Sequence, residues 1–132
     1  MRPPEPVELH VFVPGPLRNP MRGSHGHWRK HARWAKSWRE RTAERLRIER
    51  LLHPRMWQEL GDAAVPKHVA FLARTARAWD DDNLRPGLKP VRDGLQDAGL
   101  IQSDASEAGH LFLYEQRVDV ANRGVDIRIR RR

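Results

Sequence analysis

The stretch from Trp28 to Leu52 constrains the fold most, because neither glycine nor proline interrupts it. The preceding segment 14–27, PGPLRNPMRGSHGH, is rich in residues that break regular structure, and Pro54 follows the stretch closely. Within it, apolar residues recur near one stripe at helical spacing: Trp28, Ala32, Ala35, Trp38 and Leu46. We therefore expect a long helix over 28–52, preceded by a flexible basic loop over 14–27.

Four segments have the patterns of β-strands. VELHVFV (7–13) alternates, so that Val7, Leu9, Val11 and Val13 share one face. KHVAFLART (67–75) is apolar on both faces, which predicts a central strand covered from both sides. Segments 110–121 and 124–130 also predict strands, and the turn residues from Asn122 to Gly124 predict that they form a hairpin.

A second helix is predicted over 88–99, where LKPVRDGLQDAG places apolar residues at helical spacing and Gly99 supplies a C-terminal stop. MWQELGDAAVP (56–66) has room for one short helical turn. The order is strand, helix, strand, helix and two strands. We expect residues 1–132 to form a single small α+β domain, with a mixed β-sheet packed by two main helices.

The composition indicates a partner with many negative charges. The 132 residues include 25 Lys and Arg against 17 Asp and Glu, a formal charge of +8. Such an excess favours nucleic acid, because each neutralised phosphate releases counterions. The chain has no cysteine, which excludes disulfides and thiolate metal sites. It shows no apolar run of membrane-spanning length and no signal-peptide core, so we expect a cytoplasmic protein with no membrane partner.

The predicted long helix is strongly basic. Between Arg29 and Arg50 nine Lys or Arg face three Glu, an excess that favours contact with phosphates over an ordinary solvated surface. Trp34 lies off the apolar stripe and could stack on unpaired bases, whereas Trp28 and Trp38 suit a core or dimer contact. The residues predicted to bind DNA are Asn19, Arg22, Arg29, Lys30, Arg33, Trp34, Lys36, Arg41 and Arg85.

Segment 79–104, WDDDNLRPGLKPVRDGLQDAGLIQSD, crowds acids into this basic chain. The simple explanation is a capped turn, because Asp and Asn favour turns and helix N-caps. If the strand from Lys67 continued to the acids, Asp80 and Asp82 would share a face and could hold Mg²⁺. Asp104 follows the predicted second helix and could return to the same place, while Lys89 could orient a phosphate.

These residues resemble the RusA-type family of Holliday junction resolvases. The family pattern has paired acids, a lysine separated by three residues from D-x-L, and a closing acid. Asp80, Asp82, Lys89 and Asp104 match it, and Asn83 and Leu84 follow the pair as in the family. Three departures stand out: ArgProGly at 85–87 lengthens the gap before Lys89, Pro90 directly follows the lysine, and Ser103 stands where the family has another acid.

The resemblance implies a RusA-like homodimer that binds four-way DNA junctions and makes paired symmetric nicks with Mg²⁺ or Mn²⁺. It further implies a setting in recombination and repair, in a bacterial or phage-infected cell. Asp80, Asp82 and Asp104 would hold the metal and Lys89 would assist catalysis; a metal so held could polarise the phosphate and activate water. Two alternatives remain open: another metal-dependent nuclease of branched DNA or RNA, and a non-catalytic basic DNA-binding protein.

Overall fold

The computed structural model describes residues 7–19, 28–102 and 109–132, with only the backbone for Trp28 and Arg29. The strands are β1 (Glu8–Pro14), β2 (Lys67–Thr75), β3 (Leu111–Val118) and β4 (Gly124–Arg131). The helices are α1 (Trp28–Leu52), α2 (Pro54–Leu60), α3 (Leu84–Gly87) and α4 (Lys89–Asp97), and Asp81–Asn83 form a 3-10 turn. The described chain is thus a small α+β fold with a mixed sheet, as predicted.

The four strands form one sheet in the order β1-β4-β2-β3. β2 and β3 are parallel, whereas β4 pairs antiparallel with both β1 and β2. The predicted hairpin between the last two strands is therefore wrong, because β2 lies between them. The connecting residues pass the end of β2, where the Asp119 N–H donates to the Thr75 carbonyl at 2.9 Å.

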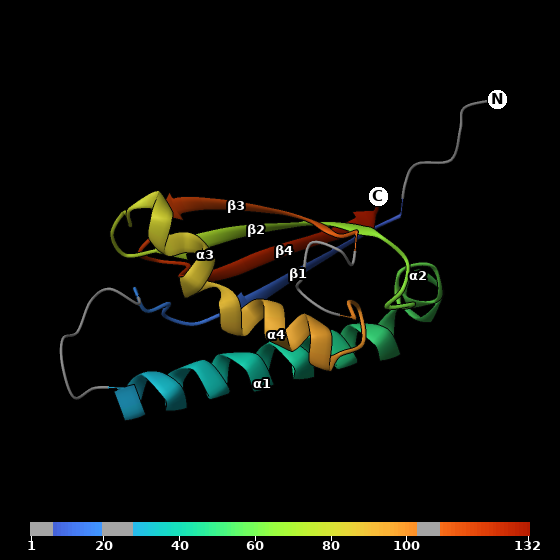
Figure 1. Ribbon diagram of the computed structural model, residues 1–132, viewed down its shortest axis with the longest axis horizontal. Coiled ribbons are helices and arrows are strands. Elements are labelled where there is room, and N and C mark those ends of the chain that lie inside the picture. Colours follow the sequence, from blue (N-terminus) through green and yellow to red (C-terminus); the bar gives the residue numbers. More distant parts are fainter. Residues whose placement is uncertain (1–6, 20–27, 103–108) are drawn as a thin grey trace.

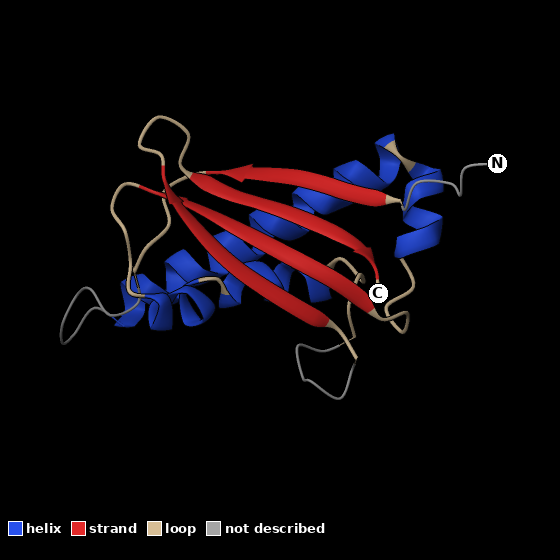
Figure 2. Cartoon of the chain, turned by 90° about the horizontal axis from the view of Figure 1, so that it is seen from above, coloured by secondary structure: helices blue, strands red, loops and turns tan. Residues whose placement is uncertain are grey.

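Helices α1 and α4 lie side by side against one face of the sheet, as Figures 1 and 2 show from two directions. The core forms between them and the inward residues of the strands; β1 contributes Leu9, Val11 and Val13, as its alternation predicted. On α1 the buried apolar residues are Trp38, Ala43 and Leu46, whereas Ala32 is exposed. Placing Ala32 on the packed stripe was wrong, since among the described side chains of α1 full burial begins only at Trp38.

The expectation that β2 is covered from both sides is also wrong. Its residues alternate between buried and partly exposed, with Val69 and Phe71 inside and Ala70 and Leu72 on the other face. Both main helices pack on the same side, so the second face of the sheet has no helical layer among the described residues (Figure 2). An unbroken apolar run can therefore belong to a strand that is covered on one face only.

Helix α4 ends as predicted at glycine. Gly99 has a φ of +82°, and the Leu100 N–H returns to the Leu95 carbonyl at 3.0 Å, which closes the last turn. Near its middle, Gly94 lets α4 approach α1 closely, because a Cβ there would lie 2.7 Å from Thr42 Cβ. No helix in the described ranges is both long and apolar enough to cross a membrane.

Candidate functional site

The acidic segment begins after the sheet has ended. β2 stops at Thr75, whose hydroxyl donates to the Arg77 carbonyl at 2.8 Å as the chain turns away. Continuing this strand to the acids was therefore wrong, and strand alternation does not bring Asp80 and Asp82 together. They instead belong to one tight 3-10 turn, with Asp80 at its N-cap position and both residues exposed.

Helix capping does not account for the acids in this structure. Asp80 has extended backbone angles at the N-cap, yet its side chain makes no capping hydrogen bond. Asn83, at the N-cap of α3, makes none either. Among the described residues, no hydrogen bond or ion pair engages the carboxylates of Asp80 and Asp82. Two exposed acids with no partner among the described residues are better suited to binding a ligand than to stabilising the turn.

Gln116 of β3 connects this turn to the sheet by hydrogen bonds. This residue was not identified from the sequence. Its Oε1 accepts from the Trp79 N–H at 2.8 Å, and its Nε2 donates to the Trp79 carbonyl at 2.6 Å and to Asp81 Oδ1 at 3.2 Å. The amide thus pairs with the backbone of Trp79 as a further strand residue would. A signal did exist: Gln116 shares the helix-facing side of β3 with Phe112 and Tyr114, where a polar residue needs a partner.

The acidic turn provides two of the carboxylates that a Mg²⁺ site would need. Mg²⁺ prefers oxygen ligands and takes one or two carboxylates with water and phosphate, which Asp80 and Asp82 could supply. In residues 7–19, 28–102 and 109–132 no group of three or more His, Asp or Glu could hold a metal ion. The predicted third ligand, Asp104, lies outside the described residues, as does Ser103.

Lys89 and Arg85 lie just beyond the acids. The inserted ArgProGly forms the body of α3, so the extra residues are taken up in a helical turn, with the Leu88 N–H bonded to the Leu84 carbonyl at 2.9 Å. Lys89 then starts α4, where Pro90 is tolerated in the first turn. The Lys89 side chain is about half exposed, and its Nζ lies 3.2 Å from Asp93 Oδ1. Arg85 is exposed.

The predicted DNA-binding residues differ in how accessible they are. Lys30, Arg33 and Lys36 are exposed on the first half of α1. Arg41 is half-buried: its guanidinium lies 4.6 Å over the Trp38 ring and donates to the Pro14 carbonyl. This residue therefore ties α1 to the end of β1, which makes it a poor phosphate ligand. Asn19 is partly buried, whereas Arg22 and the side chain of Arg29 lie outside the described residues.

Two further residues of α1 belong to the packing of the fold. Trp34 was placed off the apolar stripe, but it is partly buried against the core, with its ring centroid 6.4 Å from that of Trp38. The Arg39 guanidinium donates two hydrogen bonds, of 2.6 and 2.7 Å, to the carboxylate of Asp97 at the end of α4. These bonds hold the pKa of Asp97 below its usual value. Arg39 thus joins the two main helices, and its charge is already compensated.

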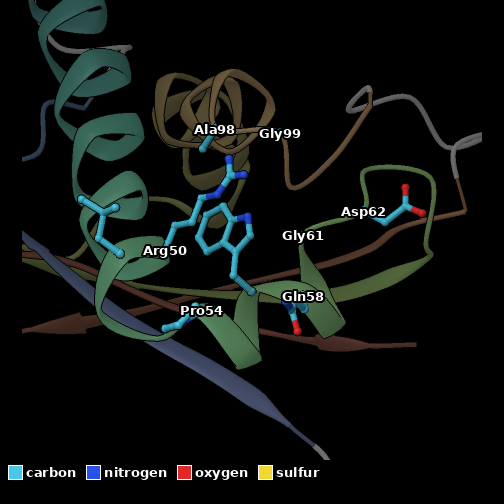
Figure 3. Close-up of a pocket in the computed structure, with 9 residues that line it drawn as sticks. Arg50, Pro54, Gln58, Gly61, Asp62, Ala98 and Gly99 are labelled. Atoms are coloured by element: carbon cyan, nitrogen blue, oxygen red, sulfur yellow. The ribbon is translucent and has the colours of Figure 1, made fainter.

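A hollow of about 550 Å³ lies at the other end of the molecule from the acidic turn, between the ends of α1 and α4 and helix α2. Figure 3 shows the Arg50 side chain reaching toward Ala98 and Gly99. Trp57 also lines the hollow. Asp62 lies across the opening. Of the residues predicted to bind metal or DNA, none that the structure describes lines this hollow.

Comparison with models of known protein families gave no match, and neither did a search of curated proteins.

Proposed function

We propose that this protein is a Mg²⁺-dependent endodeoxyribonuclease that resolves four-way DNA junctions by paired nicks. The observation that supports this best is the acidic turn itself. Asp80 and Asp82 are exposed, cap no helix and have no described protein partner, while Gln116 fastens the turn that presents them. The sequence resemblance to RusA-type resolvases supplies the substrate, because nothing in the turn alone distinguishes a junction from other nucleic acids.

The residues suggest a division of roles. Asp80, Asp82 and Asp104 would supply carboxylate oxygens to the cation. When bound there, Mg²⁺ would polarise the scissile phosphate and lower the pKa of a water molecule. Lys89 would hold a phosphate oxygen close to the acids, and Asp93, 3.2 Å from its Nζ, would steady the ammonium group.

The basic residues of α1 suit the approach of DNA to this end of the molecule. Figure 1 shows the first half of α1 at the same end as the loop that leads into α3 and α4. Lys30, Arg33 and Lys36 are exposed there. Phosphate contacts of this kind are independent of base sequence and weaken as salt is raised. Two copies of the chain would provide the two sites that a symmetric pair of cuts requires.

The test compares Asp82→Asn with Glu59→Gln, a control that removes an exposed acid on α2. Each protein is incubated with Mg²⁺ and labelled four-way junction, flap, RNA hairpin or plain duplex. We expect the wild type and Glu59→Gln to nick the junction, and Asp82→Asn to bind it without cutting. Without metal, Asp82→Asn should melt at the same temperature or higher, because it removes one of three clustered negative charges.

The outcomes separate the alternatives. Cleavage by Asp82→Asn at the wild-type rate would show that the acidic turn is not the metal site. A preference for flap or RNA would leave a metal-dependent nuclease standing but exclude a resolvase. Binding of DNA with no cleavage by any variant in Mg²⁺ or Mn²⁺ would favour the non-catalytic alternative.

A further inference from the structure

The hollow between α2 and the ends of α1 and α4 has the make-up of a ligand site. Its volume of about 550 Å³ falls within the range of about 300–1,000 Å³ that small-molecule sites occupy. Leu51, Pro54 and Ala98 give it apolar walls, while Arg50 and Asp62 contribute charged groups. Apolar walls with a few polar groups are what binds and orients a small organic molecule.

The indole N–H of Trp57 is a hydrogen-bond donor that this hollow leaves without an acceptor. Trp57 lines the hollow although the residue is only 8% exposed. Within the described ranges no hydrogen bond engages its Nε1, and this atom is not fully buried, so it stays accessible from the hollow. Indole N–H groups of buried tryptophans usually have a hydrogen-bond partner. A ligand in the hollow would supply the acceptor.

Gly61 leaves the space beside this N–H open. A Cβ on Gly61 would lie 2.4 Å from Trp57 Cδ1 and 2.6 Å from Trp57 Nε1, so any larger residue would collide with the indole edge that carries the N–H. The backbone itself does not require glycine at this position, because its φ of −78° is common to residues with side chains. Glycine is therefore needed here because of the indole edge.

Asp62 follows Gly61 directly and adds an acceptor to this side of the hollow. Two hydrogen bonds fix its position: its carbonyl accepts from the Lys67 ammonium at 2.6 Å, and its Oδ1 accepts from the Ala64 N–H at 3.0 Å. The second carboxylate oxygen, Oδ2, accepts no hydrogen bond from the part of the chain that the structure describes. A donor and an acceptor together match the edge of a nucleobase such as adenine, which presents its N7 acceptor beside its N6 amino group.

Arg50 provides a cation on the other side of the hollow. The residue is exposed, and Figure 3 shows its side chain extending toward Ala98 and Gly99, with Asp62 across the opening. Among the described residues no hydrogen bond or ion pair compensates its charge, whereas Arg45, earlier on the same helix, is paired with Glu49 at 3.4 Å. A guanidinium of this kind suits a phosphate, to which it can donate two parallel hydrogen bonds.

We propose that this hollow binds a nucleoside monophosphate, with the phosphate at Arg50 and the edge of the base at the Trp57 N–H and Asp62. The sugar lies between them, against the apolar walls. A free mononucleotide and the nucleotide at the phosphorylated end of a DNA strand share this chemistry, and the experiment distinguishes the two. The hollow is at the other end of the molecule from the acidic turn, so the inference goes beyond the proposed function and does not rest on it.

The experiment follows the indole N–H signals of the protein by heteronuclear NMR, without Mg²⁺, while deoxyadenosine monophosphate is added. The chain has five tryptophans, and the Trp57 signal is identified by its loss in Trp57→Phe. We expect the nucleotide to shift this signal until it saturates. Deoxyadenosine and inorganic phosphate, each of which lacks one part of the ligand, should bind more weakly than the nucleotide.

Arg50→Gln tests the role of the cation. The variant should bind the nucleotide about tenfold more weakly, because it loses hydrogen bonds from a charged donor to the phosphate. Since Arg50 is exposed, its replacement should leave the fold intact, which circular dichroism checks. Arg55→Gln is the matched control: it removes an exposed arginine of α2 that does not line the hollow, and it should bind as the wild type does.

Three results would overturn the proposal. The first is a Trp57 signal that does not move at millimolar nucleotide. The second is undiminished binding by Arg50→Gln, because Arg50 would then only compensate the carbonyl end of α1. The third is inorganic phosphate that binds as tightly as the nucleotide, because the hollow would then hold a simple anion.

A further titration identifies the source of the ligand. A DNA strand with a phosphorylated end that binds more tightly than the free nucleotide would support the strand end, and weaker binding would support the free nucleotide. Asp82→Asn should bind the nucleotide as the wild type does. Failure of nicking with normal nucleotide binding would therefore count against the proposed function alone, and the reverse would count against this inference alone.

Discussion

Because Gln116 holds the acidic turn by hydrogen bonds, we expect Gln116→Ala to make this turn open more often. The change removes two hydrogen bonds to the backbone of Trp79, at 2.8 and 2.6 Å, and one to Asp81 at 3.2 Å. Each of the two backbone bonds contributes about 1 kcal/mol net. The third adds little, because it is long and exposed. The closed turn should lose about 2 kcal/mol relative to an open one, so that opening becomes about 30-fold more frequent.

Hydrogen exchange of the Trp79 amide measures this directly, because that N–H donates to Gln116. Its protection should fall about 30-fold in the variant, while amides in the middle of β2 keep theirs. Nicking of a junction should slow, since Asp80 and Asp82 spend less time in place. Gln96→Ala, an exposed glutamine of α4, is the control and should change neither quantity. Unchanged protection of the Trp79 amide would contradict the role given to Gln116. Lost protection with normal nicking would show that the hydrogen bonds of Gln116 are not needed for cleavage.

Two predictions concern stability. Lys67 is fully buried, with its Nζ donating to the carbonyls of Asp62 and Val65 at 2.6 and 3.1 Å, and burial lowers its pKa to about 8. Because the unfolded lysine keeps its ordinary pKa of 10.5, the unfolded state holds more protons between these values. The free energy of unfolding should therefore rise from pH 8 to 10.5, by up to about 3 kcal/mol, relative to Lys67→Met measured by urea denaturation over the same range. Gly94→Ala should lower stability by about 1–2 kcal/mol despite the better helix propensity of alanine, because its Cβ would lie 2.7 Å from Thr42 Cβ and 2.9 Å from the Arg39 carbonyl oxygen. A thermal melt of Gly94→Ala at or above the wild-type temperature would contradict that close packing.

The elements were predictable because each depends on nearby residues. The unbroken run from Trp28 to Leu52 predicted α1 with its bounds, and Gly99 predicted the end of α4. The pairing of the strands was not predictable in the same way. Asn122 and Gly124 are turn residues, and the turn exists, but a turn does not decide which strands lie side by side. β4 enters between β1 and β2 because its inward residues, Val125, Ile127 and Ile129, fill the centre of the core.

Whether both faces of a strand are covered was as hard to predict as which strands pair with it. A run such as VAFLA in β2 suits a strand covered on both sides, and here the outward Ala70 and Leu72 are partly exposed instead. Periodicity reports which residues can tolerate burial, not which layers of structure are present.

The candidate site shows the same division between local pattern and long-range contact. The cluster of acids was visible in the sequence, but the strand expected to align Asp80 and Asp82 ends at Thr75. The support for their turn comes from Gln116, far along the chain and on another strand. Nothing in the acidic segment indicated this partner. The only signal was that Gln116 is a polar residue on the inner face of β3.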